Sequence, residues 1–388
     1  MPAGGTGTAM AAAVAHGAAG EATAPSASLP RAFSLYLDLC RLLAALLVVA
    51  SHLLPYGAIA ASSRHWWLNL GRESVVVFFV LSGFVIAYAT ERKKASLRDY
   101  CVARCTRVYS VALPVVLLGF MAAAVLVLAN RAPLDEFYQL HKPWLYLPLH
   151  LLFMGELWTL SEPPPLLAPW WSLGYEVWYY ALFGAAFYLR GGRRLLALAA
   201  LMAFVGPKLW LLLPVWGAGV MVYHWQKRHT IARTPALLGW GATLVLLAAF
   251  KGSGMDAALR ALALDNWPFP GLPLKSADRV LADYLVCLLV LANFVCARSA
   301  GFGGLLRFER PIRVLASYTF TLYLVHALVM RVWLIVYPHR RSDGMDVALL
   351  LLTIAAATWV VGQLTEHRKE WFERVFLRLT ARSQATAR

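Results

Sequence analysis

The sequence predicts an all-α protein that crosses a membrane about ten times, with both termini on the cytoplasmic side. Its 388 residues are 60% hydrophobic and 14% charged, whereas a soluble domain averages about 45–50% apolar and about 25% charged residues. A soluble globule with this composition would lack the polar side chains to cover its surface. The same figures exclude a disordered chain, a collagen and a disulfide scaffold. The apolar residues gather in segments of about 20, the length at which a helix spans a bilayer.

The predicted spans follow a tail of small residues. Residues 1–30 are mostly Ala, Gly, Ser, Thr and Pro, so we expect them to be disordered and not to form a signal peptide. The sequence Gly206-Pro207 leaves open whether 193–225 forms two spans or one broken helix. The ten predicted spans are 35–54, 73–90, 108–130, 171–189, 193–206, 207–225, 235–250, 279–297, 314–337 and 345–365.

The placement of Lys and Arg predicts the orientation of the spans. With the N-terminus inside, 23 of these residues fall in inside segments, 10 in outside segments and 3 within spans. Because positive charge collects on the cytoplasmic side, this split explains the net charge of +16 without a nucleic-acid partner. The chain then divides into the tail 1–30, a transmembrane domain 31–366 and a basic cytoplasmic tail 367–388, whose aromatic part we expect on the inner membrane surface.

Two connections between spans have distinctive compositions. The inner loop 91–107 is basic, and the long outer loop 131–170 contains an apolar stretch at 144–154 that is too short to span, so we expect an interfacial or re-entrant helix there. The five cysteines are odd in number and do not suggest a disulfide framework. Cys101 and Cys105 lack the ligand spacing of a zinc site, so no metal is expected.

Ionisable residues mark the first two spans as functional, because such groups are costly inside a membrane. Asp38, Arg41 and His52 lie in the first span. On a helix, Arg41 and His52 share one face and are separated by roughly 16 Å along the axis. The alternative is that Arg41 pairs with Asp38 at the interface and His52 caps the span. Glu73 enters the second span at the depth of His52, and Ser82 and Gly83 form either a functional site or a small-residue packing notch.

Five motifs occur in order along the chain. Leu37-Asp38-Leu39-Cys40-Arg41-Leu42-Leu43-Ala44 is followed after ten residues by His52, and Phe-Phe-Val-Leu-Ser-Gly-Phe occupies 78–84. Arg104-Cys105-Thr106-Arg107-Val108-Tyr109, Trp171-Ser172-Leu173-Gly174-Tyr175-Glu176 and Tyr323-Leu324-Val325-His326 complete the set. With these motifs the chain resembles the acyltransferase-3 family of integral membrane acyltransferases, which includes bacterial O-antigen and exopolysaccharide O-acetylases. It departs from the family pattern at Leu39 and Leu42, where the family has Gly, and at Ser110, where it has Pro.

The resemblance implies transfer of an acyl group, usually acetyl, from a cytoplasmic acyl-CoA co-substrate to a hydroxyl of a carbohydrate or lipid-linked saccharide, in a bacterial-type inner membrane. It also implies that Arg41 and His52 are needed for activity. An acceptor hydroxyl needs a base near neutral pH, which fits His52, and Glu73 or Glu176 are candidates to orient its ring. Arg104 and Arg107 are expected to bind the phosphates of CoA, although positive-inside charge is the simpler interpretation of their loop.

The predicted acceptor-binding residues are Glu176, His326, Trp171 and Ser82. Each has an ordinary alternative, because a buried carboxylate needs a partner, a lone His on an apolar helix often bonds a neighbouring helix, and Trp is common at membrane interfaces. The rival function is a transporter or flippase of a glycan or acylated small molecule, and a third possibility is a catalytically inactive structural subunit. The sequence leaves open the identity of the acceptor and of the acyl group. It also leaves open the oligomeric state and whether the acyl group is transferred directly or through an acyl-enzyme intermediate.

Overall fold

The computed structural model describes residues 28–63 and 66–385, and these residues form helices and connections without a strand. The α-helices are α1 (Arg31–Leu53), α2 (Gly71–Lys93), α3 (Leu97–Leu128), α4 (Pro143–Leu151), α5 (Trp170–Tyr188), α6 (Gly191–Val205), α7 (Pro207–Arg228), α8 (Arg233–Gly252), α9 (Met255–Asp265), α10 (Val280–Ala300), α11 (Glu309–Ala316), α12 (Thr319–Val336), α13 (Gly344–Leu364) and α14 (Glu370–Ala385). The short 3₁₀ helices are η1 (Ala61–Ser63), η2 (Trp66–Asn69), η3 (Leu134–His141), η4 (Lys275–Ala277), η5 (Gly303–Phe308) and η6 (Glu366–Arg368). The predicted tail 1–30 lies almost entirely outside the described residues.

Seven of the described helices are long and apolar enough to cross a membrane, namely α1, α2, α3, α8, α10, α12 and the segment Gly344–Arg368 that contains α13. The prediction of an all-α, multi-pass membrane protein is therefore confirmed. The other three predicted spans form α5, α6 and α7. Helix α6 has 15 residues and is about 22 Å long, shorter than the roughly 30 Å hydrocarbon core. The count of ten crossings and the cytoplasmic position of both termini stay predictions.

Helix α2 lies at the centre of the bundle. In its most apolar window 67% of the residues are buried, against 17% for α8 at the periphery. Gly83 of α2 and Gly219 of α7 allow the two helices to meet, because a Cβ on either would collide with a backbone carbonyl of the other, at Trp216 and Val80 respectively. Gly83 is thus a packing notch, as small residues commonly are between membrane helices.

The prediction that the basic segment 91–107 is a loop is wrong, because most of this segment is helical. Helix α2 continues to Lys93, and α3 begins at Leu97 and runs for 32 residues. A capping box explains the early start: the Ser96 hydroxyl accepts a hydrogen bond from the Asp99 amide, and the Asp99 carboxylate accepts one from the Ser96 amide. Charged residues after this box hid the helix from a search for apolar segments. The two arginines expected to bind CoA therefore lie on a helix.

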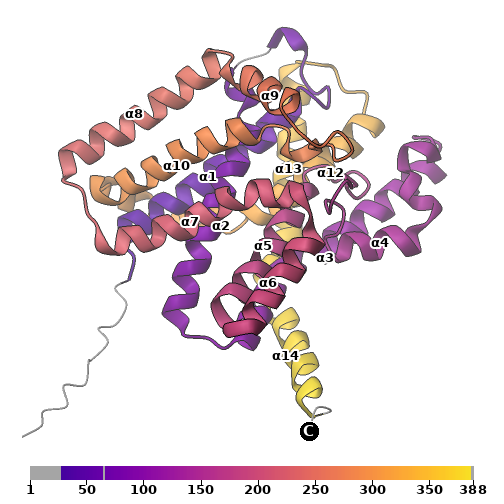
Figure 1. Ribbon diagram of the computed structural model, residues 1–388. Coiled ribbons are helices and arrows are strands. Elements are labelled where there is room, and N and C mark those ends of the chain that lie inside the picture. The colour runs from indigo at the N-terminus through magenta and orange to yellow at the C-terminus, as the bar shows by residue number, and fades with distance from the viewer. Residues whose placement is uncertain (1–27, 64–65, 386–388) are drawn as a thin grey trace, which may run out of the picture.

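The break at Gly206 separates α6 from α7. Gly206 has φ of +83°, and a Cβ there would lie 2.9 Å from Trp158, while Pro207 starts the next helix. The segment 193–225 consequently forms two helices. The apolar stretch of the long loop forms α4, and the basic C-terminal segment forms α14, which projects from the lower end of the bundle (Figure 1).

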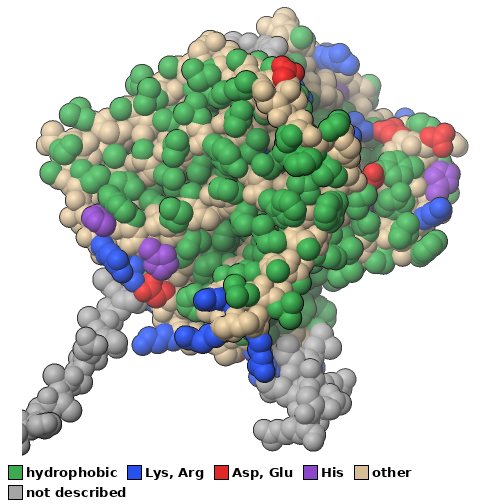
Figure 2. All heavy atoms as spheres, viewed as in Figure 1, with side chains coloured by type: hydrophobic (Ala, Val, Ile, Leu, Met, Phe, Trp, Pro, Cys, Tyr) green, Lys and Arg blue, Asp and Glu red, His purple; other side chains and the backbone are tan. Residues whose placement is uncertain are grey.

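Charges inside the bundle are paired. Lys208 contacts Glu156 at 3.1 Å with both side chains buried, and Arg72 of α2 bonds Asp283 of α10. Figure 2 shows hydrophobic side chains over most of the visible face and a group of Lys and Arg along the lower edge. A protein whose sides face lipid needs this distribution, because buried charges require partners and unpaired ones require water.

Candidate active site

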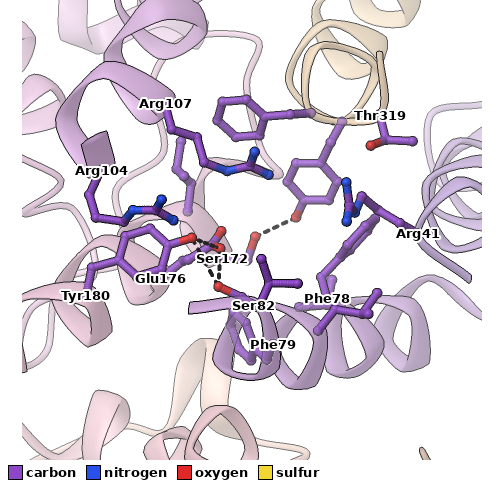
Figure 3. Close-up of a pocket in the computed structure, with 16 residues that line it drawn as sticks. Arg41, Phe78, Phe79, Ser82, Arg104, Arg107, Ser172, Glu176, Tyr180 and Thr319 are labelled. Atoms are coloured by element: carbon purple, nitrogen blue, oxygen red, sulfur yellow. Dashed lines mark hydrogen bonds between the residues drawn. The ribbon is translucent and has the colours of Figure 1, made fainter. Parts of the chain in front are cut away.

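A cavity of about 160 Å³, here called the arginine cavity, opens between α1, α2, α3, α5 and α12. Arg41 enters it from α1, and Arg104 and Arg107 enter it from α3 (Figure 3). The three-residue spacing places Arg104 and Arg107 on one face of their helix. Glu176 of α5 is the one carboxylate that lines this cavity. The lining thus contributes three guanidinium groups and one carboxylate, and the adjacent carboxylate of Asp38 offsets part of the charge of Arg41.

The arginines are held by different neighbours. Arg41 pairs with Asp38 at 3.3 Å, so the interface pairing and the position in a cavity occur together. Asp38 also accepts from Arg313 at 3.0 Å. The guanidinium of Arg104 lies 5.8 Å from the ring centre of Tyr180, and that of Arg107 lies 6.0 Å from the ring centre of Phe320. Aromatic faces support Arg104 and Arg107 without neutralising them, so the N–H groups of these two arginines can bind an anion.

A hydrogen-bond network forms the floor of the arginine cavity. The Ser82 hydroxyl donates to Glu176 Oε1 at 2.5 Å, and the Tyr180 hydroxyl donates to the same oxygen. Trp216 donates its indole N–H to Ser82 Oγ at 3.2 Å. Ser82 therefore both packs at the α2–α7 contact and orients Glu176 (Figure 3). The structure groups Glu176 and Ser82 with the arginines and away from His52.

A second cavity of about 410 Å³, here called the histidine cavity, contains His52 near the end of α1. Trp171 of α5 lines it, and the guanidinium of Arg72 lies 4.7 Å from the centre of a Trp171 ring. Glu156 also lines it, but this carboxylate is occupied by Lys208 and by the Ser276 hydroxyl at 2.6 Å. The charged groups of this wall are thus largely neutralised by one another.

His326 is the side chain that contacts His52. Its Nε2 lies 3.4 Å from His52 Nδ1, while its own Nδ1 lies 3.0 Å from the Leu322 carbonyl and must donate to it. His52 Nδ1 lies 2.8 Å from the Val48 carbonyl, so it also carries a proton. If both rings are neutral, each Nε2 atom is then unprotonated and carries a lone pair. His52 lines the cavity and is half-buried, whereas His326 is fully buried, so of these two nitrogens only His52 Nε2 belongs to a residue of the cavity lining.

Tyr323 and Val75 line both cavities and form the wall between them. The Tyr323 hydroxyl bonds Ser172 Oγ at 2.6 Å and the Pro169 carbonyl at 3.1 Å. The two polar ends of the first-span motif therefore face two separate spaces, with one aromatic side chain at their junction.

The predicted pairing of His52 with a carboxylate is wrong. Glu73 is buried on another side of α2, where its Oε1 lies 2.9 Å from both Lys251 and Arg279. Glu176 lies in the arginine cavity. The contacts of His52 are instead a backbone carbonyl, a second imidazole and the ring of Tyr56. The rotation of α2 and α5 within the bundle decides which wall each carboxylate reaches, and helical spacing within one span does not fix that rotation.

Two residues at the site were not singled out from the sequence. Tyr323 stands three residues before His326 in one motif, and this spacing places both on one helix face. Arg72 adjoins Glu73 at the start of a span, and its partner Asp283 begins another. The Tyr323 signal was present in the motif, whereas the Arg72–Asp283 pair joins positions 211 residues apart and had no local signal.

Comparison with known proteins agrees with this architecture. A family model described as an acyltransferase domain matches residues 34–363. The exopolysaccharide production protein ExoZ of Rhizobium meliloti (strain 1021) is 27% identical over 141 residues, which covers 35% of this chain and 40% of that protein, less than half of either. No solved structure of another protein matches the chain. Because the family model covers most of the sequence and both cavities, the chain belongs to the acyltransferase-3 family of integral membrane acyltransferases.

Proposed function

We propose that this protein transfers a short acyl group, acetyl in the first instance, from acyl-CoA to a hydroxyl of a carbohydrate acceptor. The observation that carries the proposal is the pair of cavities that meet at Tyr323, one lined by three arginines and the other containing His52. A transferase with two dissimilar substrates needs two such sites with a common boundary. The name of the relative ExoZ, an exopolysaccharide production protein, supports a carbohydrate as the acceptor.

The donor belongs in the arginine cavity because CoA is a polyanion. Guanidinium groups bind phosphates through paired N–H donors and keep their charge when buried. Arg41, Arg104 and Arg107 converge there, with Glu176 in the lining and Asp38 paired with Arg41. The cavity is too small for a whole CoA, so it suits one phosphate-bearing part and the start of the arm that carries the thioester toward Tyr323.

The acceptor belongs in the histidine cavity. His52 Nε2 takes the proton of the acceptor hydroxyl while the oxygen of that hydroxyl attacks the thioester carbonyl. The tetrahedral intermediate collapses as the C–S bond breaks, and the proton passes from His52 to the departing CoA sulfur. The products are an O-acyl ester and free CoA. This direct route uses the residues in place and requires no acyl-enzyme.

The positive-inside distribution supports a cytoplasmic arginine cavity and an opposite-facing histidine cavity. Arg41 lies nearer the start of α1 and His52 at its end. In a bacterial-type inner membrane, cytoplasmic acyl-CoA would then meet an acceptor presented on the far side. The ten crossings and the two cytoplasmic termini belong to this proposal.

The test is CoA release by the purified full-length protein in nanodiscs with a panel of saccharide acceptors. His52→Ala should lower kcat by about 10²–10⁴-fold, the usual contribution of a general base. Arg41→Ala should raise the KM for acyl-CoA. His224→Gln and Arg193→Ala, at exposed positions, serve as matched controls. No CoA release by any variant or by the wild type, together with passage of a labelled solute across proteoliposomes, would replace the proposal with the transporter, and release that is indifferent to His52 would remove the proposed base.

A further inference from the structure

A third cavity adjoins the histidine cavity and has no part in the transfer step described above. It has a volume of about 350 Å³. Its polar and aromatic lining comes from Tyr56, Glu136, Phe137, Tyr138, Gln139 and Arg331. We call it the Tyr138 cleft.

The Tyr138 cleft is continuous with the space around His52. Pro163 and Ala168 line both cavities. The Tyr56 ring, which lines the cleft, has its centre 5.3 Å from that of His52. A ligand that extends from the base can therefore continue into the cleft.

One buried polar atom in the cleft lacks a partner. Gln139 is 5% exposed, and its amide N–H₂ donates to the Pro163 carbonyl at 3.2 Å. Its Oε1 has no hydrogen-bond partner within the described part of the chain. A buried acceptor without a donor is costly, and a ligand hydroxyl would satisfy it.

Aromatic and charged groups complete a surface suited to sugars. Tyr138 is 40% exposed, yet its ring is held by a hydrogen bond to Glu162 and an edge contact with Tyr146 at 5.6 Å. Arg331 bonds Glu136 at 2.6 Å and lies 5.7 Å from the Tyr56 ring centre. Fixed aromatic faces pack against the C–H faces of sugar rings, while planar amide, carboxylate and guanidinium groups bond their hydroxyls.

We propose that the Tyr138 cleft binds a second saccharide unit of the acceptor, so that the acceptor is an oligosaccharide or polysaccharide and not a small metabolite. This inference rests on the proposed function and specifies its acceptor. Arg331 is neutralised by Glu136, which disfavours a phosphate as the occupant. The polar groups disfavour a lipid tail.

The test compares acceptors of different length on the full-length protein in nanodiscs with acetyl-CoA as donor. The probes are size-fractionated oligosaccharides released by mild acid from the surface polysaccharide of the source cell, and methyl glycosides of its constituent monosaccharides. The variants are Tyr138→Ala and Gln139→Leu. Trp144→Ala is the matched control, because Trp144 is an exposed aromatic residue in the same loop that does not line the cleft.

The wild type should show a KM for oligosaccharides roughly tenfold below that for monosaccharides, the effect of one well-placed polar contact. Tyr138→Ala and Gln139→Leu should abolish that difference while leaving transfer to monosaccharides and His52-dependent hydrolysis of acetyl-CoA unchanged. Equal KM values for all lengths, or variants that behave like Trp144→Ala, would overturn the cleft assignment and leave the proposed function intact. If no saccharide is acylated while His52-dependent hydrolysis persists, the carbohydrate acceptor fails and the cleft assignment fails with it.

Discussion

The contact between His52 and His326 gives a sharp prediction about which imidazole is the base. Both histidines lie in motifs of the sequence, so the motifs alone do not say which of them acts as the base. The structure separates them, because His52 lines a cavity whereas His326 is fully buried. The informative perturbation is His326→Gln, which keeps a polar side chain of similar length at the buried position.

The distances indicate a small effect for this change. His52 Nδ1 is held by the Val48 carbonyl at 2.8 Å, and the His326 contact at 3.4 Å is the weaker of the two. Loss of a neutral hydrogen bond is worth about 0.5–1.5 kcal/mol, and a long one lies at the lower end, so kcat should fall by roughly two- to fivefold. His52→Ala removes the base and should lower kcat by about 10²–10⁴-fold.

The assay is steady-state CoA release at saturating acceptor, with the thermal midpoint in detergent as the check on folding. His224→Gln provides the control for a histidine exchange at an exposed position. The assignment of His52 is refuted if His326→Gln lowers kcat as far as His52→Ala while the midpoint and the KM for acyl-CoA are unchanged. A deficit in His326→Gln confined to stability would leave the assignment standing.

Three further predictions concern the donor site, the helix packing and the long loop. Arg107→Ala should raise the KM for acetyl-CoA by about 10–100-fold, the worth of a charge-assisted hydrogen bond, without raising the KM for acetyl-pantetheine, which carries no phosphate. Gly83→Ala should destabilise the fold by about 1–3 kcal/mol, because its Cβ would meet the Trp216 carbonyl, and thermal unfolding in detergent measures the loss. Burial lowers the pKa of His150 to about 4 from its usual 6.5. As the pH falls, His150 is therefore protonated in the unfolded chain before it is protonated in the folded protein. The free energy of unfolding should consequently fall by about 3 kcal/mol as the pH drops from 6.5 to 4. His150→Phe should remove that part of the pH dependence of the thermal midpoint.

The first two of these predictions have matched control variants, and the third has an outcome that would contradict it. Arg193→Ala should leave both donor KM values unchanged, and an equal rise for acetyl-CoA and acetyl-pantetheine in Arg107→Ala would exclude phosphate binding by Arg107. Gly241→Ala should be tolerated, because a Cβ there meets no atom within 4 Å; equal losses in both glycine variants would contradict the packing argument. For His150, an unchanged pH dependence in His150→Phe would show that other groups set it.

The sequence predicted the helices well where apolar length was the signal, and it erred where helices were polar or short. The start of α3 depends on the Ser96–Asp99 capping box, which precedes the apolar stretch by a dozen residues. The break at Gly206 was visible as Gly-Pro, but only the contact with Trp158 shows why the chain turns there. Local signals of this kind are weak until a neighbouring segment is in place.

The functional residues divide in the same way. The spacing of Arg41 and His52 on one helix predicted correctly that they lie far apart along α1, and the structure assigns them to different cavities. The partner of His52 could not be predicted, because His326 lies 274 residues away and the candidate carboxylates face other walls. The position of a residue along its helix follows from the spacing in the sequence, whereas the residues of other helices that it contacts depend on how the helices pack.

The distribution of charge is the basis for proposing different substrates for the two cavities. The carboxylates Glu73 and Glu156 are each paired with buried lysines, and Asp283 is paired with Arg72, so these groups contribute little net field. The arginine cavity gathers three guanidinium groups, of which Arg104 and Arg107 are supported by aromatic rings, and the proposed function assigns these two to the phosphates of the donor. His52 has a carbonyl and a neutral imidazole as its contacts. In the proposed transfer the Val48 carbonyl and His326 therefore orient the ring of His52, the role that a carboxylate has in a Ser-His-Asp triad.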